Sequence, residues 1–221
     1  FLGLSGCGSE EQNAGQKVIK IGQVSPLTGN IAHLGKDNEN GARLAIEEAN
    51  ASGLSIGGEK VRFELISEDD EAKPLKSTIV AQKLVDAGAV GVIGHLNSGT
   101  TIPASKIYND AGIAQISPSA TNVNYTKQGF NTAFRVIAND AQQGRVLGAY
   151  AIKLGAKKIG VIDDRTDYGK GLAEEFEKSV VASGGEIVTH EFTDNTKTDF
   201  TAILTRIKSK EADLIFFSGM D

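Results

Sequence analysis

The stretch Ala89–Ala104, AVGVIGHLNSGTTIPA, places a buried strand directly before a polar helix start. Its first part is apolar and rich in β-branched residues such as Val92 and Ile93, which predicts a buried strand. Gly94 ends this strand, and hydroxyl and amide side chains follow it. Pro103 is typical of the first turn of a helix, so the stretch predicts a strand, a polar loop and a helix.

The polar loop of this stretch can serve two purposes. The first N–H groups of a helix lack partners and the helix dipole is positive there, so such a site attracts anions. Ser98 and Thr100 then belong to a binding site. Alternatively, one of these hydroxyls simply caps the helix. The stretch alone leaves both interpretations open.

The composition of the chain is that of an ordinary globular protein. It has 221 residues, of which 40% are hydrophobic and 23% charged, enough for one large or two small domains. The net charge of −5, without a Lys/Arg cluster, argues against a nucleic-acid partner. No apolar run is long enough to span a bilayer. The single cysteine, Cys7, excludes an intrachain disulfide and a cysteine-rich zinc site.

The first residues resemble the end of a bacterial export signal. Leu4-Ser5-Gly6-Cys7 is similar to a lipobox, in which the signal is cut before a cysteine that then receives lipid. The polar residues 8–16 then form a flexible tether. We therefore expect residues 1–16 to be a signal remnant, lipobox and tether, with lipid on Cys7. The alternative is a chance cysteine in a disordered terminus.

From Lys17 onward, strand and helix patterns alternate. The expected strands cover residues 18–24, 60–67, 90–93, 112–116, 132–136, 157–162, 186–192 and 213–217. Helices are expected between them, ending near residues 51, 87, 110, 154, 182 and 209. Such alternation predicts an α/β protein whose parallel sheets carry helices on both faces. Ligands of such folds bind beyond the carboxyl ends of the strands.

Two sheets are expected, because the strand near residue 136 leads into a new helix without a return partner. We predict lobe one at 17–137 and an incomplete lobe two at 138–221. In lobe one, a helix over 38–51 is expected to turn Ala42, Leu44, Ala45, Ile46 and Ala49 inward. In lobe two, Asp140 is expected to cap the first helix.

Motifs for catalysis are missing from the sequence. It has neither a G-x-G-x-x-G after the first strand, nor a P-loop, nor a G-x-S-x-G elbow. The three histidines, His33, His95 and His190, fall on separate elements and suggest no metal pair. Asp69 and Asp70 precede a helix, where its dipole favours carboxylates, and metal ligation is the less favoured alternative. Hydroxyls and amides at strand ends, without a nucleophile–base pair, favour binding over catalysis and imply no cofactor.

Several motifs together resemble a known family. They are IGQVSPLTG at 21–29, NGARLAIEEAN at 40–50, EDDEAKP at 68–74, VIGHLNSGTTIPAS at 92–105, ISPSAT at 116–121 and DYGKG at 167–171. The combination is similar to the periplasmic branched-chain amino-acid-binding proteins, the solute receptors of ABC importers. The resemblance implies the two-lobed type I periplasmic binding fold, with ligand held between the lobes. Because familiar members are longer, we also expect the chain to be truncated, without the return segments of either lobe.

The resemblance also implies a set of ligand-binding residues. Ser98 matches the serine that holds the ligand α-carboxylate, and Ser119, Ala120 and Thr121 match the segment that binds carboxylate and α-ammonium. Tyr168 matches an aromatic residue of lobe two that closes over the ligand. Leu34 matches a first-loop position that packs against the ligand side chain, and Asn97 is also expected among the ligand-binding residues.

This chain departs from the family pattern at several of these positions. Ala72 and Asn97 stand where some relatives carry a disulfide, Met220 where some have a tyrosine, and Leu34 where an aromatic is frequent. The acidic partner of the ammonium is expected beyond Asp221. Leucine, isoleucine or valine is therefore the first choice of ligand, followed by other amino acids and then small amides or aromatic acids.

We interpret the chain as a lipid-anchored, extracytoplasmic receptor that presents an amino acid to an ABC permease and catalyses nothing. A ligand-sensing module for amides or small organic acids, controlling a signalling partner, is the first alternative. An α/β enzyme with an unrecognised site is the second. The resemblance to a lipobox favours the receptor.

Overall fold

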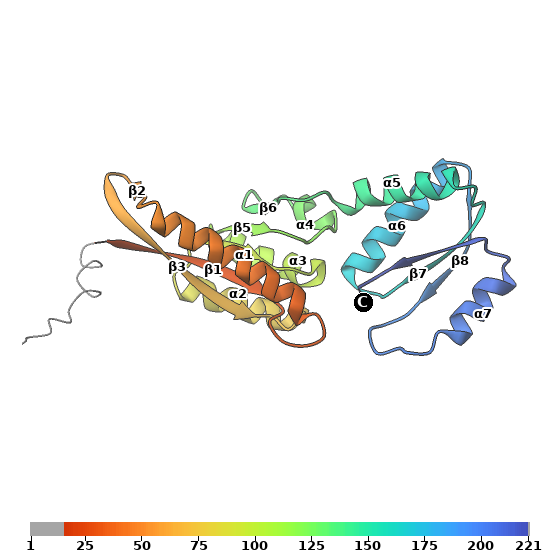
Figure 1. Cartoon of the computed structure of the whole chain (residues 1–221), viewed down its shortest axis with the longest axis horizontal. Helices are drawn as coiled ribbons and strands as arrows, with labels where there is room; N and C mark the ends of the chain where they lie inside the picture. Colours follow the sequence, from red (N-terminus) through yellow and green to blue (C-terminus); the bar gives the residue numbers. More distant parts are fainter. Residues whose placement is uncertain (1–15, 221) are drawn as a thin grey trace, which may run out of the picture.

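The computed structural model describes residues 16–220 and contains two separate sheets. Figure 1 shows the larger sheet, with its helices, at one end of the molecule and the smaller sheet at the other. We call these two parts the first and the second lobe. Cys7 and the expected signal remnant lie outside the described residues.

The first lobe is built on a six-stranded sheet in the order β2-β3-β1-β4-β5-β6. Its strands are β1 (Lys17–Ser25), β2 (Ser55–Ile56), β3 (Glu59–Asp69), β4 (Gly91–Gly94), β5 (Ala114–Ser117) and β6 (Ala133–Arg135). All pairs are parallel except the short antiparallel pair of β2 with β3. The carboxyl ends of β1, β4 and β5 therefore lie side by side, which brings the polar segments that follow them together.

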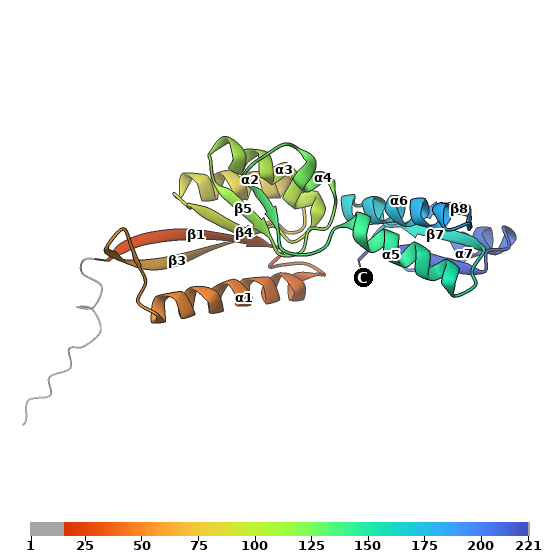
Figure 2. The same cartoon turned by 90° about the horizontal axis from the view of Figure 1, so that it is seen from above.

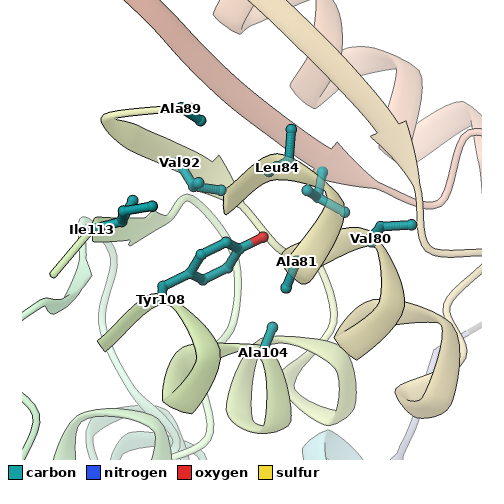
Figure 3. Packing of buried hydrophobic residues seen from close by; sticks show 9 residues of the cluster. Val80, Ala81, Leu84, Ala89, Val92, Ala104, Tyr108 and Ile113 are labelled. Carbon is teal, nitrogen blue, oxygen red and sulfur yellow. The ribbon is translucent and has the colours of Figure 1, made fainter. Parts of the chain in front are cut away.

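Helices cover both faces of this sheet. Figure 2 shows α1 (Ala32–Ala51) on one face and α2 (Pro74–Asp86) and α3 (Ser98–Asp110) on the other. The main core lies under α2 and α3, where Leu84 and Tyr108 pack against Val92 of β4 (Figure 3). All three side chains are buried, and each contributes roughly 1.5–3 kcal/mol through removal of apolar surface from water. This core fixes the start of α3 relative to the strand ends.

The second lobe has a parallel three-stranded sheet in the order β8-β7-β9. Its strands are β7 (Lys158–Asp163), β8 (Glu186–Phe192) and β9 (Leu214–Ser218), and its helices are α5 (Asp140–Lys153), α6 (Asp167–Ala182) and α7 (Thr201–Ser209). Side chains alternate along β7, so Val161 packs with Phe176 of α6 while Ile162 packs with Ile203 of α7. Helices therefore cover both faces of this sheet as well.

Two glycines let α5 and α6 approach closely. A Cβ added at Gly144 would lie 2.6 Å from the backbone of Glu175, and one at Gly148 would lie 2.8 Å from the carbonyl oxygen of Phe176. Gly144 and Gly148 are four residues apart and share one face of α5. This glycine pair therefore sets the distance between the two helices.

The fold confirms the alternating α/β pattern and corrects some details. The first helix begins at Ala32 rather than Asn38, since the loop after β1 is only six residues long. Leu44 and Ala45 are exposed rather than inward, because α1 leaves part of the sheet face beside it uncovered. Strand β2 and the one-turn helix α4 (Asn124–Lys127) are too short to produce a periodic pattern and were not expected.

The start of α5 also differs from expectation. Asn139 is its N-cap, and the Asn139 side chain accepts a hydrogen bond from the N–H of Gln142. Asp140 is instead the first helical residue, fully buried. The prediction that Asp140 caps this helix is therefore wrong, because the preceding asparagine takes the capping position.

An apolar groove of about 310 Å³ lies on the sheet face beside α1, lined by residues such as Ile46, Phe63 and Ile93.

Within residues 16–220, no helix is sufficiently long and apolar to cross a membrane.

Candidate ligand-binding site

A cavity of about 490 Å³ lies between the two lobes. The residues around it come from α1, the strand ends of the first lobe, α5, α6 and the segment after β9. They are Leu34, Asp37, Asn38, Leu96, Asn97, Ser98, Ser119, Thr121, Gln143, Tyr168, Gly219 and Met220. The volume and the mixture of apolar walls with few polar groups suit a small organic molecule.

The loop from β4 into α3 forms the floor of this cavity and is held from below. Gly94 has a φ of +133°, and a Cβ there would lie 2.3 Å from the carbonyl oxygen of Val24, so only glycine fits. The next residue, His95, is fully buried between Asp70 and Tyr108. Its Nδ1 lies 2.8 Å from Asp70 Oδ2, and its Nε2 lies 3.2 Å from the Tyr108 hydroxyl. These contacts hold His95 in place, and the loop that leads into α3 begins at this residue.

The structure shows which partners the side chains of the polar loop have. Asn97 is the N-cap of α3, and neither its side chain nor that of Ser98 caps the helix. The Thr100 hydroxyl donates back to the carbonyl oxygen of Asn97. Ser98 Oγ instead accepts a hydrogen bond of 3.2 Å from the N–H of Asn122, in the loop after β5. The simple capping interpretation is therefore wrong for Ser98, which joins two strand ends beside the cavity.

The loop after β5 is fixed through its own hydroxyls. Ser117 Oγ donates to the carbonyl oxygen of His95 at 2.7 Å and accepts from the N–H of Ala120 at 2.9 Å. Ser119 Oγ donates to the carbonyl oxygen of Leu96 at 2.9 Å. The Ser119 N–H also faces Ser117 Oγ, at 3.4 Å, so these hydroxyls fix the shape of the loop that lines the cavity.

The second lobe reaches the cavity through the first turns of α5 and α6 and the end of β9. Gln143 and Tyr168 line the cavity from these helices, and Asn97 Nδ2 approaches the sulfur of Met220 at 3.3 Å. Beside the cavity, Asn122 Nδ2 donates to the carbonyl oxygen of Asp167 at 2.6 Å. The lobes therefore touch at two places near the site.

Most of the residues implied by the resemblance surround this one cavity. Leu34, Asn97, Ser98, Ser119, Thr121 and Tyr168 all line it. Ala120 is buried beneath the surface, where its carbonyl oxygen accepts from Arg135. Asp37, Asn38, Leu96 and Gln143 also line the cavity and were not expected. Two of them could have been predicted from helical spacing. Asp37 and Asn38 follow Leu34 by three and four residues, so all three lie on the same face of α1.

The cavity is acidic in character. Among the described residues that line it, none is Lys, Arg or His, whereas Asp37 is a carboxylate. Behind Thr121 lies Asp140, which is fully buried. Burial raises the pKa of Asp140 to about 6, although Thr121 and Arg135 act in the opposite direction. Burial also raises the pKa of Tyr168, and the charge of Asp140 adds to this effect.

The two acidic residues before α2 have structural partners. Asp69 accepts hydrogen bonds from the N–H groups of Leu27 and Glu71 and from the Thr28 hydroxyl. Asp70 accepts from the N–H of Ala72 and faces His95. Residues 16–220 hold no cluster of three or more metal-ligating side chains. We therefore assign Asp69 and Asp70 to loop and helix positioning.

Comparison with known proteins places this two-lobed architecture in a family. A family model described as periplasmic binding protein matches residues 18–220. The Leu/Ile/Val-binding protein homolog 1 of Brucella abortus is 39% identical over 203 residues, covering 91% of this chain and 54% of its own length. The chain belongs to the periplasmic binding protein family.

Solved structures show the same fold. The branched-chain amino acid transporter substrate-binding protein LivJ of Streptococcus pneumoniae, solved in complex with isoleucine, is 35% identical with a TM-score of 0.79, over 91% of this chain and 57% of that one. A solute-binding protein of Rhodopseudomonas palustris, in complex with 3,4-dihydroxybenzoic acid, is 26% identical with a TM-score of 0.77, over 90% and 54%. The fold is therefore the two-lobed type I periplasmic binding fold. The chain spans about half the length of the relatives that it matches.

Proposed function

We propose that this protein is the solute receptor of an ABC importer and binds a branched-chain or related amino acid between its lobes. The observation that carries the proposal is the cavity of about 490 Å³, in which six positions implied by the resemblance come together from both lobes. Relatives named as Leu/Ile/Val-binding proteins support the choice of ligand.

The chemistry around the cavity suits a zwitterion. Ser98 is the first residue of α3, where free N–H groups and the helix dipole favour a carboxylate. The backbone of Ser119 and the Thr121 side chain lie at the neighbouring strand end and are assigned to the carboxylate and the α-ammonium. Leu34, Leu96 and Met220 provide apolar surface for an aliphatic side chain. A site that excludes water strengthens both charge-assisted hydrogen bonds.

The proposed receptor acts by closure rather than by catalysis. Tyr168 approaches the cavity from the second lobe and covers the ligand when the lobes come together. Closure is a hinge motion about the segments that join the lobes. The closed form is presented to a permease at the outer face of the membrane. Lipid on Cys7 would hold the receptor there, and mass spectrometry of membrane-extracted protein tests this anchor.

A second candidate is the binding of small organic acids without an ammonium group. The Rhodopseudomonas palustris relative with a bound aromatic acid is the observation that favours it. The two candidates differ in one respect that can be measured, since only the amino acid requires a site for a cation.

A thermal-shift screen of the protein, expressed from its complete gene, tests the proposal. Each common amino acid is compared with benzoate and dihydroxybenzoate. A true ligand at ~100 times its Kd stabilises the folded state by about 2.7 kcal/mol. The variant Ser98→Ala should lose most of this shift, whereas Ser209→Ala, exposed on α7, should keep it. The proposal fails if no amino acid raises the melting temperature.

A further inference from the structure

Asp140 is a buried carboxylate behind the Thr121 end of the cavity without a partner for its charge. It is fully buried. By strict geometry, neither of its carboxylate oxygens accepts a hydrogen bond within the described residues, and the Thr121 hydroxyl makes none, although this hydroxyl lies close enough to lower the pKa of Asp140. A buried ionised group without partners is costly, so such an arrangement calls for an explanation.

Backbone contacts hold Asp140 next to the cavity. Its N–H donates to the carbonyl oxygen of Thr121 at 2.9 Å. Gln143, one turn later on α5, and Thr121 both line the cavity. A Cβ added at Gly171 of α6 would lie 2.7 Å from Asp140 Oδ2, so α6 packs closely against this carboxylate within the second lobe. Asp140 therefore lies where both lobes meet the ligand.

The charged neighbours of Asp140 do not neutralise it by direct contact. The Arg135 guanidinium, on β6, donates instead to the carbonyl oxygens of Ala120 and Asn122 and to the Thr126 hydroxyl. From α6, Glu175 adds negative charge near Asp140, and the Asp140 charge in turn acts on the hydroxyl of Tyr168. The charge of Asp140 therefore acts on Tyr168, a residue that lines the cavity.

We infer that Asp140 selects ligands that carry a cationic group, by drawing that group to the Thr121 end of the cavity. The inference rests on the proposed function and specifies which part of the ligand it recognises. A threonine hydroxyl can accept one hydrogen bond and donate another. Thr121 can therefore accept from a ligand ammonium and donate to the Asp140 carboxylate. Asp140 acts as a positioning residue within this chain, distinct from the acidic partner that the resemblance places beyond Asp221.

The test compares ligands that differ only in the cationic group. Leucine, isoleucine and valine are titrated at pH 8 beside their 2-hydroxy acids, in which a hydroxyl replaces the ammonium. The wild-type protein, expressed from its complete gene, should prefer the amino acid. In Asp140→Asn this preference should fall by on the order of tenfold or more, since a nearby buried charge has been removed. The control Asp86→Asn removes an equal charge from the exposed surface of α2 and should keep the preference.

A second measurement needs no variant. Because an ammonium favours the ionised form of Asp140, wild-type affinity for the amino acid should weaken as the pH falls from 7 to 5, while affinity for the hydroxy acid does not. If wild type binds an amino acid but Asp140→Asn retains the full preference, or the wild-type affinity is independent of pH, the inference is wrong. If wild type binds none of the three amino acids, the proposed function fails first.

Discussion

The two lobes contribute to the cavity in different ways. The first lobe supplies loops at strand ends, and buried hydrogen bonds through His95, Ser117 and Ser119 hold these loops in place. The second lobe supplies single side chains, Gln143 and Tyr168, from the first turns of two helices that pack closely at glycines. The first-lobe wall of the cavity is therefore held in place by hydrogen bonds within its own lobe, whereas the position of the second-lobe wall depends on how α5 and α6 pack together.

The largest expected effect comes from the support under the first-lobe loops. Asp70→Ala leaves His95 Nδ1 and the N–H of Ala72 without their acceptor in a fully buried site. We expect a loss of roughly 3–5 kcal/mol in the free energy of unfolding. Chemical denaturation measures it, and Asp86→Ala, an exposed aspartate of α2, should change stability by less than about 0.5 kcal/mol. If Asp70→Ala lowered the free energy of unfolding only slightly, other contacts would have to hold the loop that follows His95.

The second effect concerns Asp140, where the lobes meet. Its pKa of about 6 in the folded protein lies above the usual value of 3.8. The folded state therefore binds this proton more tightly than the unfolded chain, and the resulting stability is present below about pH 4 and lost as the pH rises through about 6. Asp140→Asn should thus gain on the order of 3 kcal/mol at pH 8 and nothing at pH 4. Thermal melts of the ligand-free protein at the two pH values check this, and a gain independent of pH would contradict it.

The third effect tests the first-lobe wall itself. Thr121 caps no helix, since Val123 and Asn139 are the N-cap residues of α4 and α5. Thr121→Val keeps the shape of the side chain but removes the hydroxyl that we propose to bond a charged ligand group. We expect a loss of about 1.5–3 kcal/mol in binding free energy, a tenfold to hundredfold weaker affinity. Calorimetric titration measures this loss, and unchanged affinity would remove Thr121 from the binding site.

Thr205→Val, on the exposed face of α7, is the matched control and should bind as wild type does. Because the Thr121 hydroxyl is enclosed beside Asp140 rather than open to solvent, a modest loss of stability should accompany the loss of affinity. A melt of the same sample separates the two effects.

The smallest effect tests the packing that positions the second-lobe wall. In Gly148→Ala the new methyl group would lie 2.8 Å from the carbonyl oxygen of Phe176, so α5 and α6 must separate. We expect a loss of about 1–3 kcal/mol in stability. Gly41→Ala, in open space on α1, should instead stabilise by roughly 0.5–1 kcal/mol, because alanine is the better helix former. Equal behaviour of both variants, measured by denaturation, would contradict the assigned role of the glycine pair.

The sequence predicts the fold better than it predicts the site. Periodicity identified the main strands and helices, because a chain of parallel units repeats the same strong signals. It missed β2 and α4, which span too few residues for a period. It also placed the start of α1 too late, since the first turn there contains His33 and Gly35, which are not strong helix formers.

Resemblance, rather than periodicity, pointed to the residues of the cavity. Polar residues at strand ends were visible in the sequence, but their separate roles were not. Whether Ser117 or Ser119 offers its hydroxyl to a ligand depends on which backbone groups lie opposite, and this requires the folded loop. The burial of Asp140 was also hidden, because an aspartate near the start of a helix is usually a cap.

Asn122 has a consequence for how the two lobes communicate. Its backbone N–H donates to Ser98 Oγ, while its side-chain amide donates to the carbonyl oxygen of Asp167 at the start of α6. Asn122 thus connects the Ser98 hydroxyl, beside the cavity, with the first turn of α6 in the other lobe. Because only the second of these bonds crosses between the lobes, an opening of the cleft would break it and leave the first intact. In such a motion the lobes would separate on the α6 side of Asn122, and the asparagine would stay with the first lobe as the contact to which α6 returns.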